Sequence, residues 1–118
     1  MTMLLGESVR AELRPAAALF RSLGDPVRLT ILRGLVDGEA RVVDLTARLG
    51  LAQATVSAHL ACLRDCGLVT VRAVGRASVY SLAQPGLLEL FAAAEQILAA
   101  TGNAVALCPT YGDPQETS

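Results

Sequence analysis

The sequence predicts a mainly α-helical fold with a single β-hairpin, and three observations support this. The 118 residues are 53% hydrophobic and only 3% aromatic, which is typical of one folded domain with an aliphatic, helix-packed core. Apolar residues recur at helical spacing in five segments. The stretch after Gly67 departs from that spacing and is rich in β-branched residues, so a pair of strands is expected there.

The first two helices precede residue 37. Residues 7–23 carry apolar side chains at helical spacing, and because Pro15 falls inside this segment the helix is expected to start near it or to be kinked there. Asp25 followed by Pro26 is an N-cap followed by a first-turn proline. A second helix is therefore predicted from this point to about Val36.

A helix-turn-helix follows. Residues 41–49 form a short apolar-periodic segment that ends at Gly50, and residues 52–66 form a longer one that ends at Gly67. A helix of about nine residues, a tight turn with glycine and a longer helix match the spacing of this motif. The longer helix would be the one that enters the major groove of DNA.

The rest of the chain completes the predicted architecture. The segments "LVTVRAV" and "ASVYSLA" flank Gly75-Arg76, and glycine first in a two-residue loop suits a type II′ hairpin. Residues 87–100 carry an apolar stripe that is suited to pairing with another helix. The sequence thus predicts a winged helix-turn-helix with an extra helix at each end over residues 1–103, followed by a flexible tail over 104–118.

Three stretches resemble the ArsR/SmtB family of small dimeric winged-helix repressors. They read "LGDPVRLTILRGL" at 23–35, "VVDLTARLGLAQATVSAHLACLRDCGLV" at 42–69 and "GRASVYSL" at 75–82. The resemblance covers most of residues 20–82. It implies a homodimer that pairs through its terminal helices, binds double-stranded operator DNA at two half-sites and releases it when an inducer binds.

The resemblance also bears on the metal site. Many members of the family bind metal through a cysteine pair in the first helix of the motif or through His and Asp on the last helix. This chain has neither, because its first helix lacks cysteine and its single histidine is His59. The cysteines instead resemble the CmtR-like cadmium and lead sensors, in which two cysteines four apart on the recognition helix join a third from the tail. Cys62, Cys66 and Cys108 match that placement.

The placement of the two helical cysteines can be judged without the family. At 100° per residue, Val56, Leu60 and Leu63 form one buried stripe, whereas Cys62 and Cys66 fall about 90–130° away from its centre and share one flank. A cysteine is often only a small buried apolar residue. That interpretation is weakened here because both thiols lie off the stripe and one turn apart.

Three thiolates favour soft ions, of which cadmium and lead fit best and trivalent arsenic is an alternative. Zinc usually takes a fourth donor, which His59 on the same flank could supply, although this histidine is more simply explained as structural or DNA-facing. A disulfide switch is a further alternative, but bridging Cys62 and Cys66 would distort the helix. The chain has no Cys-x-x-Cys motif and no evident nucleophile–base pair, so a thiol-redox enzyme is not expected. A dimerisation module with incidental cysteines is the remaining alternative.

The candidate DNA contacts lie on the longer helix and on the hairpin. Gln53 could read adenine, and Thr55 and Ser57 could contact a base edge or a phosphate. Arg76 at the hairpin tip and Arg72 beside it are candidates for phosphate or minor-groove contact. His59 completes the predicted set. All ten basic residues are arginines within the first 76 residues, which carry a balance of +3 in a chain of net charge −1.

The predicted location is the cytoplasm. The start of the chain has no basic region followed by an apolar core, so no signal peptide is expected, and no apolar run reaches the length of a membrane span. Cysteines in the cytoplasm more often serve metal or redox chemistry than structural disulfides. The sequence therefore predicts a non-enzymatic, metal-responsive repressor that acts as a dimer without a membrane partner.

Overall fold

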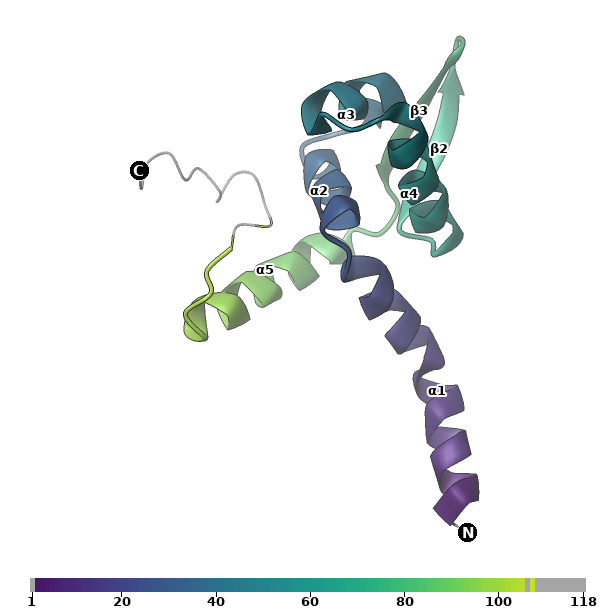
Figure 1. Cartoon of the computed structure of the whole chain (residues 1–118), viewed down its shortest axis with the longest axis vertical. Helices are drawn as coiled ribbons and strands as arrows, with labels where there is room; N and C mark the ends of the chain where they lie inside the picture. The colour runs from purple at the N-terminus through teal and green to yellow at the C-terminus, as the bar shows by residue number, and fades with distance from the viewer. Residues whose placement is uncertain (1, 106, 108–118) are drawn as a thin grey trace.

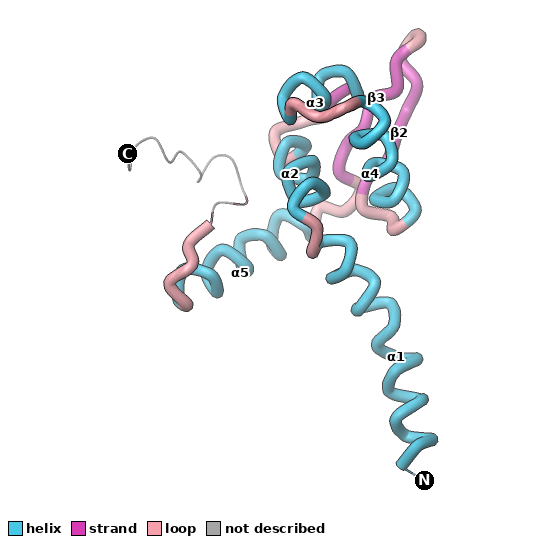
Figure 2. The backbone as a smooth tube through the Cα atoms, viewed as in Figure 1, coloured by secondary structure: helices cyan, strands magenta, loops and turns pink. Residues whose placement is uncertain are grey.

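The structure is a computed structural model that describes residues 2–105 and 107, with side chains from residue 6 onward. Its elements follow in the predicted order, with one short strand added (Figures 1 and 2). The elements are α1 Thr2–Leu23, α2 Pro26–Leu35, β1 Ala40–Arg41, α3 Val42–Leu49, α4 Gln53–Asp65, β2 Val69–Val74, β3 Ala77–Leu82 and α5 Gly86–Ala100. None of the helices described is long and apolar enough to cross a membrane.

The core lies between α2, α3, α4 and the sheet. Its most deeply buried side chains come from the three central helices: Ile31, Leu32, Leu45, Val56, Leu60 and Leu63. Helix α2 begins as predicted, because Asp25 caps its first turn and Pro26 lacks the N–H that would otherwise be unpaired. Leu87 and Phe91 at the start of α5 join the same core and attach the last helix to it.

The wing is a three-stranded antiparallel sheet in the order β1-β3-β2. Val74 pairs with Ala77 across the predicted two-residue turn. Gly75 has φ +62° while Arg76 keeps a negative φ, which is the combination a type II′ turn requires. Strand β1 was not predicted, and the expectation that Arg41 begins a helix was wrong. Arg41 is extended and pairs with Val79, and α3 starts one residue later.

The terminal helices extend away from this body in different directions (Figure 1). Helix α1 starts at Thr2 and continues through Pro15, so the expectation of a start near that proline was wrong. Apolar side chains on both helices face water in the single chain: Phe20 is 60% and Ile97 64% exposed. Beyond α5, the Glu95 carboxylate accepts a hydrogen bond from the backbone N–H of Leu107, so the first part of the predicted tail lies against this helix.

Candidate DNA interface and cysteine site

Helix α4 is fixed on one face by the core and leaves the other face free. Val56, Leu60 and Leu63 are fully buried. Gly50, with φ +68°, makes the turn before the helix, and its backbone N–H donates to the carbonyl of Thr46. The three polar residues predicted to contact DNA at the start of the helix are all exposed: Gln53, Thr55 and Ser57. His59 is half-buried, which sets it apart from those three.

The wing arginines differ in their surroundings. Arg76 is exposed at the hairpin turn and has an open approach to solvent. Arg72 instead forms a two-pronged ion pair with Glu39, the residue just before β1, through its Nε and Nη2 atoms. The guanidinium of Arg72 is therefore already paired within the chain, whereas Arg76 presents its charge at the tip.

An open polar hollow of about 300 Å³ connects the wing with the start of α4. It is lined by residues from three segments of the chain: Arg41, Val42, Val43, Gln53, Arg76, Ala77 and Ser78. Two of the predicted DNA-contacting residues thus share one surface, and Arg41 joins them. Arg41 could not be predicted from the sequence, because its place beside Arg76 depends on β1, which pairs with β3.

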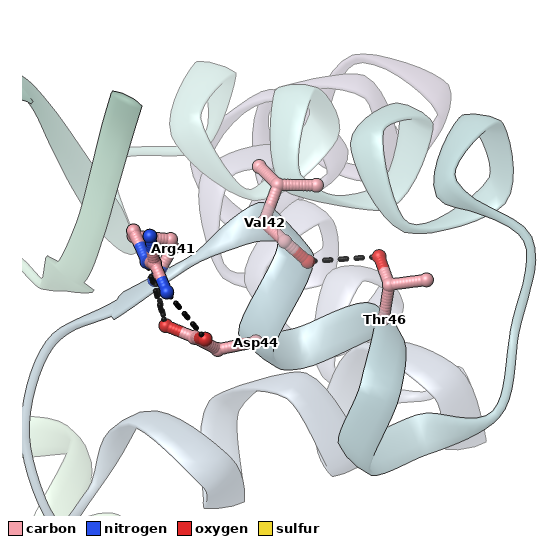
Figure 3. A network of polar contacts seen from close by, with 4 residues as sticks. All are labelled: Arg41, Val42, Asp44 and Thr46. Atoms are coloured by element: carbon pink, nitrogen blue, oxygen red, sulfur yellow. Dashed lines mark hydrogen bonds and ion pairs between the residues drawn. The ribbon is translucent and has the colours of Figure 1, made fainter. Parts of the chain in front are cut away.

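Arg41 is held at the start of α3 by Asp44 (Figure 3). Its Nε and Nη2 atoms donate to the Asp44 carboxylate, each at 3.1 Å, and its backbone N–H donates to Oδ2 at 3.3 Å. Hydrogen bonding with the Arg41 side chain is the main reason that the pKa of Asp44 is lowered, and the same bond raises the pKa of Arg41. One turn on, Thr46 Oγ1 donates to the carbonyl of Val42 at 2.8 Å. The first turn of α3 is thus held by its own side chains.

The two helical cysteines lie off the buried stripe, as predicted. Cys62 is half-buried. Cys66 is exposed and is the C-cap of α4, one residue after the last helical residue, Asp65. Both sulfurs face the junction of α1 and α2. Arg28 Nη1 donates a hydrogen bond to Cys62 Sγ at 2.9 Å, and Ser22 Oγ lies 2.9 Å from Cys66 Sγ, where either atom could be the donor.

These partners were missed by the sequence analysis. Ser22 and Arg28 are separated from their cysteines by 44 and 34 positions, so only the docking of α4 against the first two helices brings them together. Ser22 is 5% exposed and ends a helix of exposed apolar residues. In the sequence, the serine near the end of this apolar-periodic segment is the feature that could have indicated a polar contact.

The third predicted ligand, Cys108, lies outside the described residues. Within residues 2–105 and 107, no three His, Cys, Asp or Glu side chains gather closely enough to hold a metal ion. His59 is therefore not brought together with Cys62 and Cys66 into such a group. His59 lies instead near Asp25. The pKa of Asp25 is lowered mainly by the hydrogen bond from the backbone N–H of Arg28, and the interaction with His59 is a smaller cause in the same direction.

Comparison with known proteins identifies the chain's relatives. A family model described as "Bacterial regulatory protein, arsR family" matches residues 25–71. The probable mercury resistance operon repressor of Streptomyces lividans is 36% identical over 92 residues, which are 78% of this chain and 74% of that protein. The transcriptional regulator CmtR of Mycobacterium tuberculosis is 43% identical over 84 residues, which are 71% of each chain.

Two solved structures share the fold. The NMR structure of the cadmium metal-sensor CMTR from Mycobacterium tuberculosis matches with a TM-score of 0.60 and 39% identity, over 76% of this chain and 88% of that one. The homodimeric winged helix-turn-helix DNA-binding domain Mb0332 from Mycobacterium bovis matches with a TM-score of 0.68 and 33% identity, over 76% and 82% of the two chains. The chain belongs to the arsR family and is a DNA-binding winged-helix transcriptional regulator, not an enzyme.

Proposed function

We propose that this protein is a homodimeric repressor of the cytoplasm that releases its operator when a soft metal ion, cadmium or lead, binds Cys62, Cys66 and Cys108. The observation that carries the proposal is the position of the two helical thiols. They lie on α4, the helix whose exposed face would read DNA, and both contact the α1–α2 junction. An ion bound there would act on the DNA-reading helix and on a terminal helix at once.

The donor set fits such an ion. Thiolates are soft ligands that select soft metals, and two sulfurs one turn apart on a helix can share one ion. The described residues supply two thiols, so a third ligand must come from elsewhere. Cys108 is that candidate, and Leu107 beside it is already held against α5 by Glu95. The relatives named for mercury and for cadmium support a soft ion.

For DNA binding, the proposal assigns Gln53, Thr55 and Ser57 to base or phosphate contacts and Arg76 to the backbone beside the wing. The shared hollow of Gln53 and Arg76 supports this assignment. Arg72 and His59 stay in the proposed set, although Arg72 must exchange its bond to Glu39 for a phosphate. The exposed apolar faces of α1 and α5, and the homodimeric state of the Mycobacterium bovis domain, support pairing of two copies.

The deciding experiment titrates cadmium, lead, zinc and arsenite into the reduced full-length protein. Thiolate-to-metal absorption and the affinity for an operator duplex, selected from a randomised pool, are measured on the same samples. Binding of cadmium or lead in a ratio of one ion per site, with loss of DNA affinity, is expected. Single Ser substitutions at the three cysteines should each weaken both signals. A triple variant that still releases DNA with every ion would refute the proposal.

The same samples separate the alternatives. Release by arsenite alone would identify an arsenite-responsive repressor that uses the same cysteines. Release by an oxidant in the absence of metal, with loss of two titratable thiols, would identify a thiol-redox-sensing repressor. The order of the ions in the titration then fixes which one the protein senses.

A further inference from the structure

Arg28 is a half-buried cation whose side chain has a thiol as its partner. Its Nη1 donates to Cys62 Sγ at 2.9 Å, and its Nε atom is buried without a hydrogen-bond partner among the described residues. Buried polar atoms are usually paired, so an unpaired nitrogen beside a thiol requires an explanation.

No carboxylate neutralises this guanidinium at ion-pair distance within the described part of the chain. The backbone N–H of Arg28 and, less strongly, its charge lower the pKa of the nearby Asp25, but this carboxylate is not within ion-pair distance of the guanidinium. Its Oδ1 accepts from the backbone N–H groups of Val27 and Arg28 at 2.8 and 3.1 Å. The half-buried His59, the other titratable group near Asp25, is not an anion. Among the described residues, the direct side-chain partner of the Arg28 guanidinium is therefore the sulfur of Cys62.

The charge of a filled three-thiol site depends on the ion. A divalent ion that replaces the protons of three thiols forms three metal–sulfur bonds, releases three protons and leaves a complex of net charge −1. Arsenous acid reacts with the three protonated thiols: three arsenic–oxygen bonds break, three arsenic–sulfur bonds form, three waters leave with the thiol protons, and the complex is neutral. The two products thus differ by one unit of charge at the position that Arg28 faces.

The geometry points to Arg28 as the residue that selects between ions by the net charge of the filled site. It favours the anionic complex of a divalent ion over the neutral complex of trivalent arsenic. This inference rests on the proposed three-cysteine site. A guanidinium N–H bond to an anionic sulfur is charge-assisted and is stronger than one to a neutral sulfur. The complex with a divalent ion thus places a negative charge directly against Arg28, whereas the arsenic complex leaves the half-buried cation with only the more distant Asp25 carboxylate.

The test compares metal affinities of the full-length protein with those of its Arg28→Gln, Arg28→Met and Arg28→Lys variants. The affinities for cadmium, lead and arsenite are measured by competition with a chelator or a dithiol. In the two neutral variants the affinity for the divalent ions should fall about tenfold or more, as expected for loss of a hydrogen bond to a charged group, while that for arsenite holds or rises. Arg28→Lys keeps the charge and should retain most of the divalent preference.

The control is Arg48→Gln, which removes the same charge from an exposed position of α3 and should leave the ratio of affinities unchanged. Side-chain NMR of the unmodified protein gives a second readout that needs no variant. The Nη protons of Arg28 should exchange slowly with water in the cadmium complex and fast in the arsenic complex.

An unchanged affinity ratio in the neutral variants, or equal proton exchange in both complexes, would overturn the role of Arg28. The proposed function would survive that result, because it fails only if the three cysteines do not bind the inducer at all. If the triple cysteine variant loses metal binding while Arg28→Gln leaves the ratio of divalent to arsenite affinities unchanged, the three-cysteine site stands and the role of Arg28 fails.

Discussion

Ser22 and Cys66 join the end of α1 to the end of α4, with 2.9 Å between Oγ and Sγ. Ser22 is buried in this contact, so its hydroxyl depends on the sulfur for a partner. A metal-bound sulfur can only accept a hydrogen bond, which would require Ser22 to be the donor. The contact is thus a route by which an ion at Cys66 could influence the orientation of α1.

Replacing Ser22 by Ala should destabilise the metal-free protein by about 0.5–1.5 kcal/mol, the usual net value of one hydrogen bond. The same change should reduce the loss of DNA affinity on adding cadmium, because the link from Cys66 to α1 is cut. Urea denaturation and DNA titration measure the two effects. Ser8→Ala, at an exposed position of the same helix, is the control and should change neither.

The Asp25 cap predicts a dependence of stability on pH. Hydrogen bonds from backbone N–H groups, that of Arg28 above all, lower the pKa of Asp25 in the folded state below its ordinary value of 3.8. The stabilisation is therefore present above pH 3.8 and is lost as the pH falls through the lower, folded-state pKa. Asp25→Ala should be less stable than the parent at neutral pH.

The difference between Asp25→Ala and the parent should shrink as the pH falls below 3.8, and thermal midpoints over a pH series measure it. Asn at this position should keep most of the cap without the pH dependence, since its side-chain oxygen also accepts from the backbone. Glu12→Ala, at an exposed site of α1, is the control. A pH profile of Asp25→Ala parallel to that of the parent would contradict the prediction.

Arg76 and Gln53 should have different effects on DNA binding although they share one hollow. If Arg76 contacts a phosphate as proposed, Arg76→Ala should weaken binding to all sequences alike and lower the salt slope by about 1. If Gln53 reads a base as proposed, Gln53→Ala should cost about 1–3 kcal/mol at the preferred base only. Fluorescence anisotropy at several salt concentrations, on matched and mismatched duplexes, distinguishes them. Equal losses on both duplexes for Gln53→Ala would exclude base reading by this residue.

Glu39 should restrain DNA binding through its ion pair with Arg72. Glu39→Gln weakens that pair and frees the guanidinium for a phosphate, so DNA affinity and the salt slope should both rise. The gain should disappear in the double variant with Arg72→Ala. If the double variant gains as much affinity as Glu39→Gln alone, Arg72 does not contact DNA.

The exposed apolar faces of the terminal helices predict that charge there separates the two copies. Phe20→Asp or Ile97→Asp should shift the protein from dimer to monomer in sedimentation experiments, because each places a charge in the pairing surface. Val43→Asp, 58% exposed on α3, should leave the dimer intact. Monomeric parent protein at micromolar concentration would remove the basis for this prediction.

Most of the helix boundaries and the hairpin turn could be predicted, because glycine and proline mark them. The Asp25-Pro26 start of α2 and the glycines at 50 and 75 act locally, through caps and backbone angles that the sequence alone specifies. Strand β1 could not be predicted, since two residues have no periodicity and pair only with β3. Helix α1 continues through Pro15, which local rules treat as a boundary.

The site was predictable to the extent that it lies on one helix. The spacing of Cys62 and Cys66 and the buried stripe beside them follow from the period of α4. Their partners do not, because Arg28 and Ser22 reach the sulfurs only through packing of separate helices. The pairing of Arg72 with Glu39 is of the same kind, and no local pattern distinguishes that arginine from Arg76.

The long, exposed α1 has a consequence for a protein that pairs as proposed: its stability would depend on its own concentration. A helix of 22 residues spans about 33 Å, and much of its apolar surface lies in water in a single chain. By mass action, if two copies pair through this surface as proposed, the protein becomes more heat-resistant as its concentration rises. A cell that makes little of it would therefore hold a more labile switch than one that makes much.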